Sequence, residues 1–142
     1  MNYKKIDDIY LLCLQEGERV IGSIERFVET EGIISGFFWA VGAIRNVELG
    51  IFDIEEKDYI KAIFKDYYEI VSCHGNISVD PESKKPVIHT HISIADKNFK
   101  LFGGHLFEAE VTVTFEMILL PVTVPIHRNI NQKFNLKLWK VI

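Results

Sequence analysis

Hydrophobic residues recur with a helical period in one stretch of this chain, between positions 18 and 32. They are spaced three and four residues apart and alternate with charged residues, which predicts an amphipathic helix with one buried face. Gly32 is a suitable end for this helix, because glycine readily adopts the left-handed backbone conformation. The apolar positions of the helix are Val20, Ile21, Ile24, Phe27 and Val28.

The rest of the chain shows the period of two that is typical of half-buried strands. A buried strand is expected at residues 9–14, before the helix. The pattern predicts a hairpin of residues 59–64 and 67–73, turning at Lys65 and Asp66, and a break in the chain at Gly103 and Gly104. The other expected strands are 37–41 and 47–51, joined by a connection at 42–46, and then 74–79, 87–95, 100–102, 111–120 and 134–141.

One helix and about eight short strands with tight connections predict an α+β fold. Its sheet is expected to be largely antiparallel and twisted, with the one main helix packed on it. No repeat or flexible linker divides the sequence, so a single domain over residues 1–142 is expected.

Composition and net charge disfavour several classes of protein. Of the 142 residues, 48% are hydrophobic and 25% are charged, which is the balance of a globular protein rather than a disordered one. The net charge of −4 disfavours nucleic-acid binding, because such proteins usually carry a basic surplus that contacts phosphates. The longest apolar run, residues 117–126, contains two prolines and is shorter than the ~20 residues of a membrane span, so no membrane partner is expected.

The cysteines and the first residues point to a reducing location. Cys13 and Cys73 fit neither a metal-binding spacing nor a disulfide framework. The first residues lack the long apolar segment of a signal peptide. A cytoplasmic location is therefore expected.

Three histidines carry the clearest chemical signal. His89 and His91 are two residues apart on a predicted strand, so both side chains point away from the face of Thr90. His105 follows two glycines, whose backbone freedom can bring it beside the pair. Three histidines with an open fourth position are a known zinc arrangement. The alternative is that His89 and His91 are ordinary half-buried strand residues without a metal.

Other polar residues are weaker candidates. Glu116 or Glu69 could accept a hydrogen bond from a metal-binding histidine or act as a general base. For Glu116 the equal alternative is a solvated position on an outer face. Arg45 and Asn76 are candidates for contact with an anion or another subunit, although Arg45 is equally compatible with a turn residue in water.

Cys73 and His74 suggest a nucleophile and its base, but adjacent strand residues point to opposite faces. Cys73 is therefore expected to be a buried structural residue. His127 is expected at the surface.

Five segments, in this order, make the chain similar to the plants-and-prokaryotes conserved (PPC) domain. They are residues 36–43 (GFFWAVGA), 47–53 (VELGIFD), 68–77 (YEIVSCHGNI), 89–96 (HTHISIAD) and 103–106 (GGHL). The resemblance covers about residues 6–122, which defines a core and leaves residues 123–142 as a C-terminal extension.

The resemblance implies a compact α+β domain with an antiparallel sheet and one main helix, assembled as a homotrimer. Plant members carry AT-hook segments and occur in nuclear DNA-binding proteins, and stand-alone prokaryotic members are described as DNA-binding by analogy. This chain has no AT hook. It resembles the stand-alone prokaryotic type, whose three histidines, here His89, His91 and His105, imply a bound metal ion, zinc first among them.

Three functions follow as hypotheses. The first is a trimeric assembly or ligand-binding module whose metal is structural or binds a small anionic ligand. The second is a DNA-binding transcriptional regulator, which requires the trimer to gather Arg45, Lys84 and Lys85 on one face. The third is a metal-dependent hydrolase, in which zinc activates a water molecule and Glu116 or Glu69 is the base.

Overall fold

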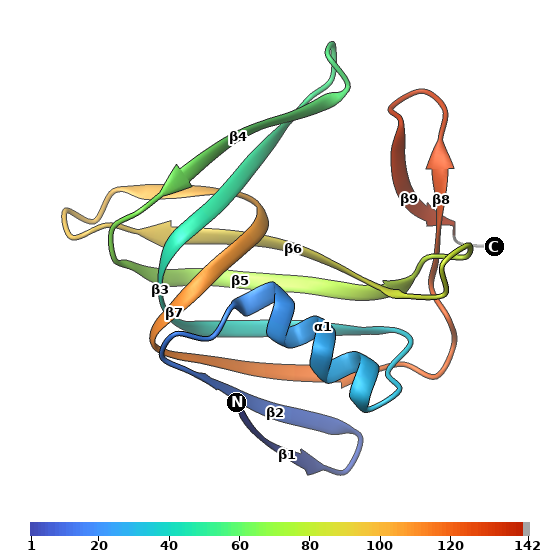
Figure 1. The fold of residues 1–142 in the computed structure, drawn as a ribbon, viewed down its shortest axis with the longest axis horizontal. Coiled ribbons are helices and arrows are strands. Elements are labelled where there is room, and N and C mark those ends of the chain that lie inside the picture. The colour runs from blue at the N-terminus through green and yellow to red at the C-terminus, as the bar shows by residue number, and fades with distance from the viewer. Residues whose placement is uncertain (141–142) are drawn as a thin grey trace.

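The computed structural model describes residues 1–140 as one helix and a nine-stranded sheet (Figure 1). This confirms the predicted α+β class. The helix is α1 (Val20–Thr30). The strands are β1 (Asn2–Ile6), β2 (Ile9–Gln15), β3 (Gly36–Asp53), β4 (Asp58–Phe64), β5 (Tyr68–Val79), β6 (Pro86–Ala95), β7 (Leu101–Pro121), β8 (His127–Asn131) and β9 (Leu136–Lys140).

The sheet follows the order β1-β2-β7-β3-β5-β8-β9, with β4 paired to β3 and β6 paired to both β5 and β7. Every pairing is antiparallel except the short contact of β5 with β8, so the prediction of a largely antiparallel sheet is confirmed. The two ends of β7 pair with different strands: residues 101–105 with β6, and residues 114–119 with β2. Two hairpins of this sheet, one formed by β3 with β4 and one by β8 with β9, project at the top of Figure 1.

Two predicted breaks are instead parts of long strands. The expected connection at 42–46 lies inside β3, which has a bulge between Ala40 and Gly42. Gly42 has a φ of 144°, and a Cβ atom there would lie 2.1 Å from the carbonyl oxygen of Thr114. Gly103 and Gly104 lie inside β7, where a Cβ would come within 2.8 Å and 2.7 Å of backbone oxygens on the neighbouring strands. These glycines allow close strand approach rather than ending a strand.

The predicted hairpin of residues 59–64 and 67–73 is wrong in its pairing. β4 pairs with β3 over a turn at residues 54–57, whereas β5 pairs with β3 and β6. The sequence pattern also missed β1, all of whose residues are exposed, and β8. The expected last strand is present as β9, and residue 141, its predicted end, lies outside the described residues.

Helix α1 packs on one face of the sheet, contacting β6 and β7 (Figure 1). Its predicted apolar face is correct: Val20, Ile24 and Val28 are fully buried. Full burial of side chains of this size stabilises a fold by about 1.5–3 kcal/mol each. No helix within residues 1–140 is both long enough and apolar enough to cross a membrane.

A carboxylate from the sheet caps the beginning of α1. The N-cap residue, Arg19, makes no capping hydrogen bond with its side chain. Instead Glu108 on β7 accepts hydrogen bonds from the backbone N–H of Ile21 at 2.8 Å and of Gly22 at 3.2 Å. A negative charge here also interacts favourably with the helix dipole. The contact ties the helix to β7, the strand that carries His105.

Candidate metal centre

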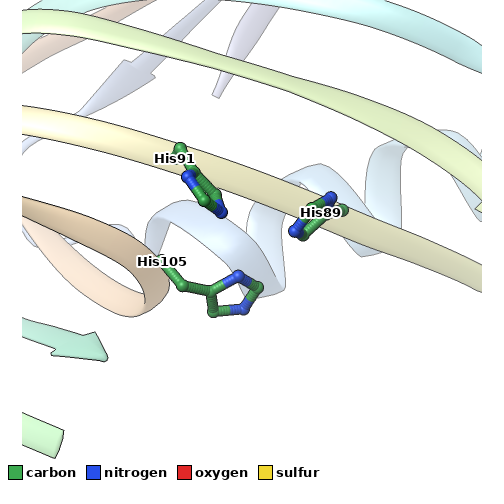
Figure 2. A group of neighbouring side chains, drawn as sticks. All are labelled: His89, His91 and His105. Atoms are coloured by element: carbon green, nitrogen blue, oxygen red, sulfur yellow. The ribbon is translucent and has the colours of Figure 1, made fainter. Parts of the chain in front are cut away.

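The three histidines converge on the face of the sheet opposite the helix. His91 on β6 pairs directly with His105 on β7, and His89 lies two residues before His91 (Figure 2). One ring nitrogen from each histidine lies within 4.8 Å of the others, close enough for one metal ion to draw them together. The prediction that His105 joins the pair is therefore confirmed.

Alternation along β6 explains this arrangement. Thr90, Ile92 and Ile94 are buried against the core, with exposed fractions of 0%, 3% and 0%. His89 is half-buried and His91 is exposed, because the intervening positions must point to the opposite face. The core thus fixes the direction of both imidazoles. At Gly104, β7 approaches the backbone of Gly50 closely, and the next residue on β7, His105, supplies the third imidazole.

The surroundings of the histidines keep their imidazoles neutral. Burial lowers the pKa of His89 to about 4, and the positive charge of Arg128 acts in the same direction. Burial also lowers the pKa of His105 to about 4, with smaller effects from His91 and Arg128. The pKa of His91 is lowered as well, first by burial and then by His74. A neutral imidazole offers the free lone pair that a metal requires.

The donor set fits a transition metal such as zinc. Nδ1 of His105 is buried and has no hydrogen-bond partner within the described part of the chain. A buried polar atom without a partner is unfavourable unless a ligand or ion meets it. Three imidazoles also form a recognised ligand set for zinc with one open coordination position.

A cleft of about 330 Å³ opens next to the histidines. His89 and His91 line it together with aromatic and polar residues of the neighbouring strands, among them Phe37, Trp39, His74 and Asn76. This volume suits a small molecule. A ligand in the cleft would meet an aromatic wall on one side and imidazoles on the other.

Two residues that no sequence pattern indicates act on this centre. The ring of Tyr59 on β4 lies 5.1 Å from that of His105. Arg128 on β8 is only 6% exposed, and its charge acts on His89, His105 and Tyr59. Neither residue falls in a motif, because each lies on a hairpin that is separate from the strands of the histidines. A buried arginine in a polar segment, His127–Asn131, gives no signal in the sequence.

The structure does not bring the two candidate carboxylates to the histidines. Glu116 is exposed on β7, opposite Cys13 and Val41, and lines a different cleft. Glu69 is exposed on β5, opposite Ala95. No hydrogen bond joins either one to a histidine within residues 1–140.

Arg45 and Asn76 have partners within the chain. Arg45 forms an ion pair with Glu110, so its charge is already neutralised. Oδ1 of Asn76 accepts hydrogen bonds from Arg128 at 2.8 Å and from the indole of Trp139 at 3.2 Å. Asn76 also lines the cleft directly, so it connects Arg128 to that cleft.

The remaining candidate residues do not belong to the three-histidine group. Cys73 is buried, as predicted, and burial raises the pKa of its thiol to about 12, so it is not a nucleophile near neutral pH. His74 lines the cleft but is not part of the three-histidine group. His127, which was expected at the surface, is half-buried, and its Nδ1 is buried.

Comparison with known proteins places this arrangement in a family. The family model described as the Plants and Prokaryotes Conserved (PCC) domain matches residues 1–123. The chain belongs to the plants-and-prokaryotes conserved (PPC) domain family. The resemblance seen in the sequence is thereby confirmed. The β8–β9 hairpin of this PPC protein, which contains Arg128, lies outside the matched residues.

Solved structures agree over almost the whole PPC chain. A candidate DNA-binding protein of Bacteroides thetaiotaomicron has a TM-score of 0.93 at 26% identity, covering 98% of this chain and 96% of that one. A PPC protein of Pyrococcus horikoshii has a TM-score of 0.86 at 30% identity, covering 99% and 94%. A metal-containing protein of Archaeoglobus fulgidus has a TM-score of 0.86 at 30% identity, covering 99% of each chain.

One curated protein is also similar to this PPC chain. It is the bifunctional protein GlmU of a Synechococcus species, 28% identical over 99 residues. The match includes 69% of this chain but only 14% of that protein's length. This chain therefore spans only a small part of the length of that protein.

Proposed function

We propose that this PPC protein is a homotrimer that binds a divalent transition metal ion, zinc first among them, through His89, His91 and His105, and presents it to a small ligand. The convergence of three neutral imidazole nitrogens within 4.8 Å carries the proposal. The likeness to the metal-containing protein of Archaeoglobus fulgidus supports it.

The residues at this centre have different roles. A zinc ion held by three imidazoles supplies Lewis-acid chemistry at an open coordination position. His89 and His105 are partly shielded from water, so they stay neutral, while His91 is open to the cleft. Phe37 and Trp39 exclude part of the solvent from that cleft. We assign no hydrolytic role, because neither Glu116 nor Glu69 is placed to act as a base.

Zinc titration of chelator-treated protein by calorimetry tests the metal site. The expected result is about one zinc per chain for the wild type and strongly weakened binding for His105→Ala. His74→Ala is the matched control. His74 on β5 is paired with His91, as His105 on β7 is, but His74 is outside the three-histidine group. Equal affinity in wild type and His105→Ala would contradict the proposal.

The homotrimer is supported by an exposed apolar face. Leu11, Ile118 and Trp39 pair across β2, β7 and β3, and their exposed fractions are 38%, 48% and 54%. Val41, two residues after Trp39, is also 54% exposed. A contiguous apolar surface of this kind is typical of a subunit interface.

Sedimentation velocity tests the assembly. We expect a trimer for the wild type and a smaller species for Val41→Asp. Val124→Asp is the control, because Val124 is 70% exposed in the loop between β7 and β8 and is not part of the paired strands of this face, so the trimer should stay intact. A wild-type monomer would contradict this part of the proposal.

DNA binding is the second candidate, favoured by the likeness to the candidate DNA-binding protein of Bacteroides thetaiotaomicron. The net charge of −4 and the pairing of Arg45 with Glu110 weigh against it. A gel-shift assay over a range of salt decides between the two functions. Binding that weakens steeply with salt would favour the regulator, and no shift at low salt would exclude it.

A further inference from the structure

Arg128 is a buried cation without an acidic partner. Its side chain is 6% exposed and donates hydrogen bonds to three neutral oxygens: Oγ of Ser78 at 2.7 Å, the carbonyl of Lys137 at 2.9 Å and Oδ1 of Asn76 at 2.8 Å. Within residues 1–140 it forms no ion pair. A buried charge is normally paired, so an unpaired one indicates that an anion belongs beside it.

The guanidinium is linked to the histidine centre through Asn76. Its partner Asn76 pairs with His89 across β5 and β6, and Asn76 and His89 line the same cleft. Its positive charge contributes to the lowered pKa of both His89 and His105, after burial. Arg128 is thus connected to the histidine cleft through Asn76, and Tyr59 reaches the centre through its ring contact with His105.

The site as a whole lacks negative charge. No aspartate or glutamate of the described chain belongs to the three-histidine group, and none raises the pKa of His89 or His105, as a nearby negative charge would. A divalent ion on three neutral imidazoles keeps its full charge, and Arg128 adds another. A small anion would supply the missing charge.

The geometry of Arg128 favours a carboxylate. Its three hydrogen bonds to the protein use three of its five N–H groups and hold the plane of the guanidinium. Two N–H groups remain, which matches the two oxygens of a carboxylate. The aromatic wall of Phe37 and Trp39 suits the carbon part of such a ligand.

We propose that the cleft binds a small organic carboxylate, with its carboxylate group on Arg128 and a second oxygen directed to the metal. This rests on the proposed metal site. Arg128 is then the residue that selects for charge, and Asn76 and Ser78 are positioning residues that orient it.

Cobalt-loaded protein gives a direct test, because the visible spectrum of Co²⁺ reports a new ligand at the metal. Lactate, a 2-hydroxycarboxylate, is the probe, and lactamide is its neutral counterpart. We expect lactate to shift the spectrum saturably and lactamide to leave it unchanged. Arg128→Gln should weaken lactate binding by about tenfold or more without changing the affinity for Co²⁺. Arg128→Lys should retain part of the binding.

Arg45→Gln is the matched control. It removes an arginine that already forms an ion pair with Glu110, so this variant should bind lactate as the wild type does. Asn76→Ala provides a second variant if Arg128→Gln does not fold, as judged by circular dichroism. It removes the oxygen that orients Arg128 and should also weaken lactate binding.

The outcomes separate the two proposals. Failure of the wild type to bind Co²⁺ would overturn the metal site itself. Normal Co²⁺ binding without a lactate effect, or an equal effect of lactate on wild type and Arg128→Gln, would overturn the carboxylate site alone. Tighter, Arg128-dependent binding of inorganic phosphate would overturn the choice of a carboxylate in favour of a phosphate-bearing ligand.

Discussion

His91 on β6 and His105 on β7 are directly paired across two antiparallel strands, and their ring centroids are 5.7 Å apart. Paired residues on neighbouring strands point to the same face, so this register brings both imidazoles to one side of the sheet. A metal ion at this position would crosslink β6 and β7, two strands that otherwise meet over only five residue pairs.

The crosslink predicts that metal stabilises the fold. With zinc at about a hundred times its dissociation constant, the free energy of unfolding should rise by about 2.7 kcal/mol. Thermal unfolding with and without a chelator measures this effect. The chelator should lower the melting temperature of the wild type and of His74→Ala, but not that of His91→Ala. A chelator effect of the same size in all three proteins would place the metal elsewhere.

The metal-free protein should lose stability in mild acid. The pKa values of folded His89 and His105 are lowered to about 4, whereas an unfolded histidine takes up a proton near pH 6.5. The unfolded state therefore binds more protons between these values, so stability is full above about pH 6.5 and falls toward pH 4. Urea unfolding of the wild type and of His89→Gln between pH 7 and pH 4 measures this pH dependence of the free energy of unfolding. The variant should show the shallower pH dependence, and parallel curves would contradict the assignment.

Replacing Glu108 should weaken the attachment of α1. Glu108→Ala removes the acceptor for the N–H groups of Ile21 and Gly22 and should reduce the free energy of unfolding by about 1–2 kcal/mol. Glu29→Ala is the control, because Glu29 is exposed on the same helix and should change stability by less than about 0.5 kcal/mol. Equal effects of the two variants in urea unfolding would show that Glu108 does not act as a cap.

The bulge in β3 should depend on glycine at position 42. Gly42→Ala would add a Cβ in contact with the backbone at Thr114 and also impose an unfavourable φ, so we expect a loss of about 3 kcal/mol or more. Gly17→Ala separates the two effects. Gly17 has a φ of 81° with open space around it, so only the backbone cost of about 1–2 kcal/mol should appear. Similar losses in both variants would mean that the contact at Thr114 relaxes freely.

The sequence predicted those features that short-range periodicity determines. The apolar stripe of α1 and the alternation around Thr90 could be deduced correctly, because each depends only on neighbouring residues and a buried face. The convergence of His89, His91 and His105 followed from the same alternation together with the glycines before His105. The family resemblance was visible for the same reason, since its motifs are short and contiguous.

Long-range pairing could not be deduced in this way. Gly42 and Gly104 look like breaks in the sequence, but the structure uses them to let strands approach. Residues 59–64 look like the partner of the strand that follows, yet β4 pairs with the preceding β3. Arg128 lies on the β8–β9 hairpin and is connected to the site by its hydrogen bond to Asn76 on β5. These two residues are far apart in the sequence. No local pattern encodes such contacts.

The most direct test of the central claim is elemental analysis of untagged protein purified without chelator. The three-histidine site predicts about one zinc or related metal ion per chain in the wild type and in His74→Ala, and almost none in a His89→Ala/His91→Ala double variant. Metal-free wild type, or the same metal content in the double variant, would contradict the account.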